Sequence, residues 1–388
     1  MLQHKLDQSV TQIYHPIAQA PNYSDQRLLN KVLQRLMTKP AIVELLEIQA
    51  LNKLLNELYE ERGIILQAGE CAETFELMQP ETITRQAKLI VSLGKRLQSN
   101  LNKPVLVNSR LGGQFAKPRT YGFSQLNRQL LPTYYGDLIN GQELNQRQPN
   151  PMRMLLGYQV MKRAMQQLMD INIGVGSKFF TMHEAYHLPF EQALLRSQQQ
   201  QHWASTGHIV WVGARTNHPK YAHVQFVKNI QNPIGIKISS ALRPSQLQEI
   251  LTELSPRPAP IMLILRLGCK NTKTMLPSLV RAANSQRVFW ILDPMHGNTH
   301  RLKNGVKTRV IPEMQQEIYD TAQILTRHGT YLAGIHLELT ATKVRECVDD
   351  LANVSCSTHF DAGSMICDPR LNSLQAERLV DTYAQVIT

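Results

Sequence analysis

Two sets of polar side chains in this sequence are of types that could carry out chemistry. The first set contains cations near the ends of short apolar runs, and its members are Arg110, Lys117, Arg119, Arg215, Lys237 and Arg266. The second set contains potential metal ligands, and its members are Cys71, His296, Glu338 and Asp368. Arginine binds phosphates and carboxylates through a bidentate fork, and lysine binds them as a point charge. A thiolate, an imidazole and carboxylates together suit Mn, Co, Fe or Zn better than Mg or Ca. Both sets would therefore support a metal-assisted reaction of substrates with several negative charges.

Spacing alone does not make either set specific. The potential ligands are far apart in the sequence, and none of the four lies in a CxxC or HExxH motif. A buried cysteine is usually a small hydrophobic residue, and a basic residue after a strand is usually a solvated loop cation. The two sets indicate a functional site only if the fold brings their members to one place.

Short apolar runs recur along the chain after residue 63. They read IILQAG, PVLVNSR, SKFFTMHE, HIVWVGART, PIGIKIS, IMLILRLG, VFWILDP and AGIHLEL. Such short, often β-branched runs are typical of buried parallel strands, and helical patterns separate several of them. We therefore predict an α/β fold, a (β/α)8 TIM barrel, with a doubly wound open sheet as the alternative. Active sites of these barrels lie at the carboxyl ends of the strands, where both polar sets would meet.

The first part of the chain is predicted to be helical. The stretch SDQRLLNKVLQRLMTKP starts with capping residues and ends at a proline, and the amphipathic stretch after it ends at a glycine. We expect an N-terminal helical extension over residues 1–63 and a catalytic barrel over residues 64–388. The segment from Leu130 to Gly174 is longer than one connection needs and is predicted to add a helix. The polar stretch SQQQQH, Ser197 to His202, is interpreted as a short linker.

The composition favours a globular protein of the cytoplasm. The chain has 388 residues, of which 43% are hydrophobic, and a formal net charge of +12. Its cations are scattered rather than clustered in blocks, so we expect no nucleic-acid partner and interpret the charge as a solvated surface and an anion pocket. No stretch approaches the roughly 18 apolar residues that span a bilayer, and no signal-peptide pattern is present. The five cysteines lack the tight spacing of a secreted disulfide framework.

Several long motifs of the chain resemble those of one family, the type II 3-deoxy-D-arabino-heptulosonate 7-phosphate (DAHP) synthases. They occur in the family's order from about Ile64 onward and read ECAE, GGQFAKPRT, LPTYYGDLING, VWVGART, NPIGIKI, DPMHGNT, GIHLELT and CDPRLN. The resemblance implies a (β/α)8 barrel that condenses phosphoenolpyruvate with erythrose 4-phosphate and releases phosphate, the first step of the shikimate pathway. It also implies a divalent metal ion, Mn²⁺ or Co²⁺ by preference, with Zn²⁺ or Fe²⁺ as alternatives.

The resemblance assigns roles to individual residues of this chain. The implied metal ligands are Cys71, His296, Glu338 and Asp368. The implied ligands of phosphoenolpyruvate are Arg110, Arg215, Lys237 and Arg266, with the backbone of Ala214. Lys117, Arg119 and Thr120 correspond to the KPRT element that meets the aldehyde and its phosphate. Lys117, with the metal ligands Cys71 and His296, would take part in catalysis.

The chain also departs from the family pattern. Tyr221 stands where glycine is usual, Asn217 and Tyr135 stand where arginine is common, and Cys269 stands where asparagine is common. These changes bear on the acceptor more than on the metal or on phosphoenolpyruvate. The length resembles compact members from secondary-metabolite pathways such as phenazine synthesis, which predicts weak feedback inhibition. We expect a homo-oligomer, a dimer by preference.

Two alternatives to this activity stay open, and one further expectation follows. A related enzyme could condense phosphoenolpyruvate with another aldehyde, and a non-catalytic homologue could serve as a binding partner.

The resemblance implies that Cys71 and Asp368 bind the same metal ion. Cys367 immediately precedes Asp368, so its sulfur is expected near that of Cys71. We therefore expect a Cys71–Cys367 disulfide to form under mild oxidation of the metal-free protein.

Overall fold

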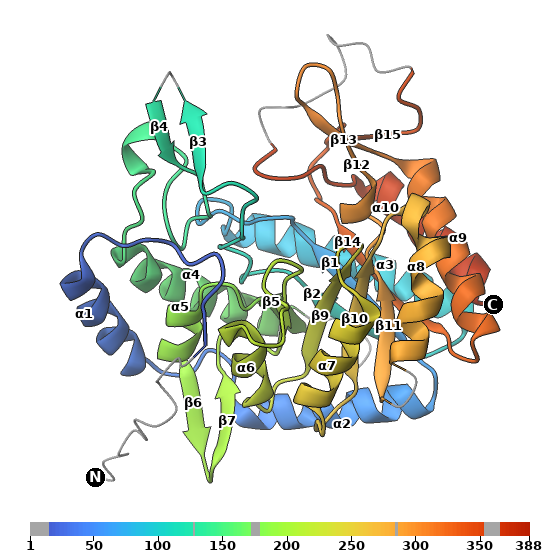
Figure 1. The fold of residues 1–388 in the computed structure, drawn as a ribbon, viewed down its shortest axis with the longest axis horizontal. Helices are drawn as coiled ribbons and strands as arrows, with labels where there is room; N and C mark the ends of the chain where they lie inside the picture. Colours follow the sequence, from blue (N-terminus) through green and yellow to red (C-terminus); the bar gives the residue numbers. More distant parts are fainter. Residues whose placement is uncertain (1–14, 127–128, 172–178, 284–285, 353–364) are drawn as a thin grey trace.

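Parallel strands form a closed barrel at the centre of the molecule (Figure 1). The computed structural model describes residues 15–126, 129–171, 179–283, 286–352 and 365–388. Around the barrel the strands follow the order β1-β14-β11-β10-β9-β8-β5-β2. Their bounds are β1 Ile64–Gly69, β2 Val105–Ser109, β5 Phe180–Glu184, β8 Ile209–Val212, β9 Ile234–Ser239, β10 Ile261–Arg266, β11 Val288–Leu292 and β14 Leu332–Glu338. All eight predicted runs are strands of this barrel, which confirms the predicted fold and excludes the open sheet.

Helices follow the strands and cover the outside of the barrel. They are α3 Pro80–Leu101, α4 Met152–Asp170, α5 Leu188–Ala193, α6 Ala222–Lys228, α7 Pro244–Leu254, α8 Cys269–Ala282, α9 Ile311–Arg327 and α10 Ser373–Ile387. Alternation along each strand divides the core into two parts. In β9, Ile234, Ile236 and Ile238 pack outward among the helices, whereas Met262 and Ile264 of β10 pack inside the barrel. The helix predicted between Leu130 and Gly174 is α4.

Two helices precede the barrel, as the sequence predicts. Helix α1, Gln26–Met37, begins at Asp25, whose carboxylate accepts a hydrogen bond from the backbone of Leu28, and it packs on α4 and α5. Helix α2, Leu45–Glu60, lies below the strands in Figure 1 and buries Leu51, Leu55 and Leu58 in the same cluster as the barrel interior. It therefore closes the amino-terminal end of the barrel. The division into an extension and a catalytic barrel stays a proposal.

Smaller sheets were not predicted. The polar stretch interpreted as a linker instead forms a hairpin of β6, Leu195–Gln198, and β7, Gln201–Ala204. Its two turn residues, Gln199 and Gln200, both have positive φ, 48° and 63°, the backbone that two-residue hairpin turns require. The other small elements are the hairpin β3 Phe123–Leu126 and β4 Gln129–Pro132, the sheet of β12 Thr299–Arg301, β13 Lys307–Val310 and β15 Cys347–Val348, and the short helices η2 Leu144–Gln146 and η3 His296–Asn298. In the described part of the chain, no helix is long and apolar enough to cross a membrane.

Candidate active site

Polar side chains replace apolar ones at the carboxyl ends of the barrel strands. Met262 and Ile264 point into the barrel, so Arg266, two residues further along β10, points into its mouth. The same alternation directs Lys237 of β9 and Glu338 of β14 inward, and Arg110 follows β2 directly. The cation set and the ligand set of the sequence therefore meet at one mouth, as an active site in this fold requires.

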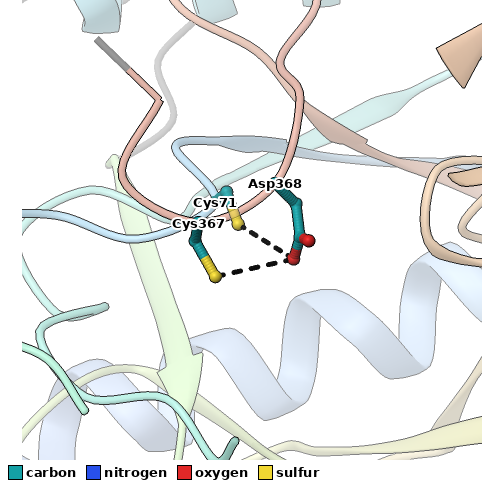
Figure 2. Close-up of side chains that lie close together, drawn as sticks. All are labelled: Cys71, Cys367 and Asp368. Atoms are coloured by element: carbon teal, nitrogen blue, oxygen red, sulfur yellow. Dashed lines mark hydrogen bonds between the residues drawn. The ribbon is translucent and has the colours of Figure 1, made fainter. Parts of the chain in front are cut away.

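The four potential metal ligands lie in one cluster, although they come from distant loops and strands. His296, Glu338 and Asp368 form one group of potential ligand atoms within 4.8 Å of one another, and Cys71, Cys367 and Asp368 form a second. Figure 2 shows both cysteine sulfurs pointing toward the Asp368 carboxylate, the Cys71 Sγ at 3.5 Å and the Cys367 Sγ at 3.6 Å from Oδ2. The His296 Nε2 lies 3.1 Å from the Glu338 Oε1. This donor set fits a divalent ion of intermediate softness.

Asp293, which sequence reasoning left without a role, orients the imidazole of His296. Its Oδ2 lies 2.6 Å from the His296 Nδ1, and its Oδ1 accepts hydrogen bonds from the backbone of Met295 and His296. The His296 Nδ1–H therefore donates to Asp293, and Nε2 is directed toward Glu338. A carboxylate that fixes the tautomer of a ligating histidine is a common feature of metal sites. The DPMHGN motif supplies both residues, and the short helix η3 starts at His296.

Cations surround the ligand carboxylates and keep them ionised. Burial alone would raise the pKa of Glu338, but His296, Lys117 and Arg309 lower it well below its usual range. The Arg309 guanidinium lies 2.9 Å from Glu338, and Lys307, also absent from our predictions, lies 2.7 Å from Asp368. Ionised carboxylates are the form that binds a metal ion.

Lys117 enters the ligand cluster from the loop after β2. Its Nζ lies 2.8 Å from the Cys71 Sγ, 3.0 Å from the Asp368 Oδ2 and 3.8 Å from the Glu338 Oε1. Although burial lowers the pKa of this ammonium group, Cys367, Cys71 and the two carboxylates raise it well above its usual range. Lys117 is therefore a protonated group placed beside the potential metal ligands.

The buried cations of the mouth share a neutral histidine. Arg110, 2% exposed, and Lys237 each approach the Nε2 of His336 at 3.1 Å. The Nδ1–H of His336 donates to Gln67, so Nε2 is an acceptor. Burial, followed by the charges of Lys237 and Arg110, lowers the pKa of His336 well below its usual range.

Lys237 also forms an ion pair with Asp293. Burial lowers the pKa of Lys237 to about 8, although the Asp293 carboxylate opposes this change.

Two of the arginines keep donors without partners. The buried Nε atoms of Arg110 and Arg266 have no hydrogen-bond partner among the described residues. Buried polar groups are almost always hydrogen-bonded, so these donors suit an anionic ligand between β2 and β10. The site thus fits the implied phosphoenolpyruvate at Arg110, Lys237 and Arg266.

The remaining substrate-binding candidates lie at the rim. Arg215 is exposed and donates to the Thr120 hydroxyl at 2.8 Å. Arg119 donates to the Tyr134 carbonyl and to the Cys367 sulfur, both at 2.7 Å. A pocket of about 170 Å³ adjoins Arg215 and is lined by Ala214, Arg215, Asn217, His218, Tyr221, Ser239, Ala241, Leu242 and Gln246. The KPRT loop and the loop after β8 therefore share one rim.

Glu184 is a residue of the mouth that sequence reasoning missed. Phe180 and Met182 of β5 point into the barrel, so Glu184 points the same way and His183 points outward to Glu191. Burial raises the pKa of Glu184 against the effect of Lys117, Lys237 and other cations, and its Oε1 has no hydrogen-bond partner in the described structure. A Cβ at Gly213 would lie 1.9 Å from this oxygen. Two-residue alternation along FTMHE could have identified it.

Comparison with known proteins decides the family. The sequence model of the class-II DAHP synthetase family matches residues 8–174 and 171–384. The chain belongs to the class-II DAHP synthetase family. This result confirms the resemblance seen in the motifs, and with it the expected enzyme class, a DAHP synthase. The chain matches members of this family over almost its whole length.

Three relatives show how close the match is. The phospho-2-dehydro-3-deoxyheptonate aldolase of Neurospora crassa is 30% identical, over 95% of this chain and 93% of its own. That of Streptomyces coelicolor is 29% identical, over 96% and 95%. A probable phospho-2-dehydro-3-deoxyheptonate aldolase of Pseudomonas fluorescens is 31% identical, over 92% of each chain.

A solved structure supports the fold independently. The phospho-2-dehydro-3-deoxyheptonate aldolase of Francisella tularensis SCHU S4 superposes with a TM-score of 0.53 and 13% identity, over 93% of this chain and 94% of that chain. At this identity the likeness concerns the barrel alone. The roles of individual residues in this class-II DAHP synthetase therefore rest on the geometry described above.

Proposed function

We propose that this protein condenses phosphoenolpyruvate with erythrose 4-phosphate and water to give DAHP and inorganic phosphate, and that the reaction depends on a divalent metal ion. The observation that carries the proposal is the meeting of Cys71, His296, Glu338 and Asp368 with the cation set at one barrel mouth. Names of the curated relatives support the same reaction.

The cations hold the two substrate anions against their mutual repulsion. Arg110, Lys237 and Arg266 bind phosphoenolpyruvate, with Arg215 and the Ala214 backbone at its edge, whereas Arg119 and Thr120 bind the phosphate of the aldehyde. The hydrogen bond from Arg215 to Thr120 joins the two subsites. Holding two reactants in attack geometry converts a bimolecular step into an effectively unimolecular one.

The chain's own residues supply the proton transfers. When bound, the metal ion acts as a Lewis acid that polarises the aldehyde carbonyl. As C3 of phosphoenolpyruvate attacks that carbonyl carbon, the protonated Nζ of Lys117 donates a proton to the developing alkoxide. Glu184 has an oxygen without a hydrogen-bond partner among the described residues and lies near Lys117 and Lys237, and it accepts a proton from the water that adds to C2. As the resulting hemiketal phosphate collapses, the bond between C2 and the phosphate ester oxygen breaks, C2 becomes a ketone, and the proton of its hydroxyl leaves with inorganic phosphate.

Phosphate release tests the reaction and its metal dependence. The protein should release phosphate only when both substrates are present, a chelator should abolish the release, and Mn²⁺ or Co²⁺ should restore it better than Mg²⁺. Cys71→Ser and His296→Ala should be folded, bind less metal and lose more than about 10²-fold in kcat, because each removes a ligand. Activity within tenfold of wild type in either variant, with metal content controlled, would refute the ligand assignment.

A second candidate function is condensation with a different aldehyde. Tyr221 supports it, because this ring lines the pocket beside Arg215 where the family usually has glycine. A panel of phosphorylated aldehydes in the same assay separates the two reactions. No phosphate release with any aldehyde would favour the non-catalytic homologue. A dimer, a cytoplasmic location and weak feedback inhibition complete the proposal.

A further inference from the structure

A buried carboxylate outside the ligand cluster holds the loop that carries Lys117. Glu73 is fully buried, and its Oε1 accepts a hydrogen bond from the backbone of Gly112 at 2.8 Å. Its Oε2 accepts from the backbones of Gly113 and Gln114 at 2.9 Å and 2.7 Å. The Glu73 N–H in turn donates to the Gln114 carbonyl at 2.9 Å. Glu73 therefore ties the loop after β1 to the loop after β2.

Burying this carboxylate is costly, and the loop needs both of its oxygens. Every hydrogen-bond donor that reaches Glu73 in the described part of the chain is a backbone amide. A carboxylate loses its hydration when it is buried, and these amides take the place of the lost water. A glutamine in its place would direct an NH₂ group at one backbone N–H, so only a carboxylate accepts from all three amides.

A chain of contacts leads from Glu73 to Lys117. The Gln114 side chain donates to the Ala116 carbonyl at 3.0 Å and accepts from the Glu184 backbone at 3.2 Å. Gly112 has a φ of 77°, and a Cβ at Gly113 would lie 3.0 Å from the His183 Cβ, so the backbone passes close to β5. Ala116 immediately precedes Lys117.

The two ends of this chain of contacts lie next to Cys71 and Lys117, whose side chains touch each other. Cys71 lies two residues before Glu73, and the Lys117 Nζ lies 2.8 Å from the Cys71 Sγ. The spacing between the implied thiolate ligand and the lysine is therefore set through the Glu73 carboxylate. We propose that Glu73 is a positioning residue that holds Lys117 and Arg119 at the aldehyde subsite, an inference that rests on the proposed function.

Kinetics of Glu73→Gln test the proposal. The variant should lose about 10²-fold in kcat, the loss expected for a misplacement of about 1 Å, and the KM for erythrose 4-phosphate should rise. The KM for phosphoenolpyruvate should stay within about twofold, because Lys237 and Arg266 stand on strands and Arg110 directly follows β2, ahead of the three residues that Glu73 holds. Wild-type kinetics in Glu73→Gln, or equal losses for both substrates, would overturn the proposal.

A matched control separates positioning from loss of stability. Asn232 is fully buried at the amino-terminal end of β9, where it donates to Ala204 and Gly207 and accepts from Ala204. Asn232→Ala should lower the thermal midpoint as Glu73→Gln does, yet keep both KM values and kcat.

A second variant keeps the proposal testable if Glu73→Gln does not fold. Gln114→Met removes the side-chain hydrogen bonds of Gln114 to Ala116 and Glu184. It should raise the KM for erythrose 4-phosphate and leave that for phosphoenolpyruvate within about twofold, the same split between substrates. No split in Gln114→Met would then overturn the proposal.

Crystal structures provide a readout that does not depend on the reaction. Residues 112–117 of Glu73→Gln should be displaced from their wild-type path, with the Lys117 Nζ further from the Cys71 Sγ. An unchanged path would overturn the proposal even if activity fell. If the wild-type protein releases no phosphate from phosphoenolpyruvate and erythrose 4-phosphate, the proposed function fails. The displacement of residues 112–117 in Glu73→Gln still tests whether Glu73 holds the loop.

Discussion

At the scale of single residues, the mouth of the barrel combines groups whose charges depend on one another. Asp293 contacts both His296 and Lys237, so one carboxylate orients a potential metal ligand and a lysine that we propose binds the substrate anion. His336 accepts from Arg110 and Lys237, which keeps two like charges at a fixed spacing. Buried networks of this kind are stable only when nearly every member is paired, which is why a change at one residue should affect its neighbours.

Binding of phosphoenolpyruvate should weaken at alkaline pH through Lys237. Burial lowers its pKa from about 10.5 to about 8, so the cation that we propose binds the substrate anion is present below about pH 8 and is lost above it. We expect kcat/KM for phosphoenolpyruvate to fall as the pH rises through about 8. Lys237→Arg keeps its charge at every accessible pH and should lack this fall. An identical alkaline limb in the arginine variant would contradict the assignment.

Mild oxidation of the metal-free protein should join Cys71 and Cys367. Their sulfurs belong to one group of atoms within 4.8 Å, and both cysteines are free thiols in the structure (Figure 2). Oxidised glutathione would take up the two electrons, and the two thiols would lose their protons as the S–S bond forms. Activity should fall and return with a reductant, and bound metal should protect.

Peptide mapping of the oxidised protein decides this prediction. Cys367→Ser removes one partner without removing a predicted metal ligand, so its activity should resist the same treatment. Inactivation with Cys71 and Cys367 both recovered as free thiols would contradict the disulfide.

At the scale of elements, the loop after β8 shapes the pocket beside Arg215. Tyr221 is the residue before α6, and its ring lies 5.0 Å from that of His218 between ring centres. Both rings line the pocket beside Arg215, and Ser239 at the end of β9 and Gln246 in the first turn of α7 complete it. The pocket therefore depends on how the loop after β8 leads into a short helix.

Tyr221→Gly should change acceptor choice more than phosphoenolpyruvate binding. Removing the ring enlarges the pocket beside Arg215, so we expect relative kcat/KM values among aldehydes of different length to change by about tenfold, a usual effect of losing apolar contact with a substrate. Glycine is tolerated at a residue that precedes a helix. Tyr221→Phe keeps the ring and should keep the wild-type order of aldehydes. Unchanged kinetics with every aldehyde would show that this pocket does not contact the acceptor.

At the scale of the whole molecule, helix α2 closes one end of the barrel, and the candidate active site lies at the other. Helix α2 covers the amino-terminal end with Leu51, Leu55 and Leu58, while the opposite end carries the ligands and cations. Stability and chemistry are thus separated along the barrel axis, as this fold allows.

Truncation of the α2 contact should destabilise the protein without changing catalysis. Leu55 is fully buried, so Leu55→Ala should cost about 2–5 kcal/mol in urea unfolding. Leu46 on the same helix is 78% exposed, and Leu46→Ala should change stability by less than about 0.5 kcal/mol. Both variants should keep kcat and KM at a temperature where they are folded. Equal costs for the two substitutions would show that α2 does not close the barrel.

The sequence alone determined the elements and the residue types of the site. Apolar runs of strand length with helical patterns between them specify parallel strands packed among helices, because each run must be buried on both faces, and only the closed strand order separates the barrel from an open sheet. The motifs around Cys71, His296, Glu338 and Asp368 stand at the ends of those runs or in adjoining loops. Small hairpins were harder to predict: the turn at Gln199 and Gln200 uses positive φ without glycine or asparagine, the usual signals.

Only the tertiary structure decided how these residues meet. Closure of the barrel pairs β1 with both β2 and β14, which brings Cys71 beside Asp368 across almost the whole chain. Strand phase turns Glu184 inward and His183 outward, and the β12–β13–β15 sheet brings Lys307 to Asp368. Such contacts depend on registers and loop paths, which have no local periodicity in the sequence. Glu73 is the clearest case, because its role lies in three backbone amides of another loop, and any residue except proline could supply those donors.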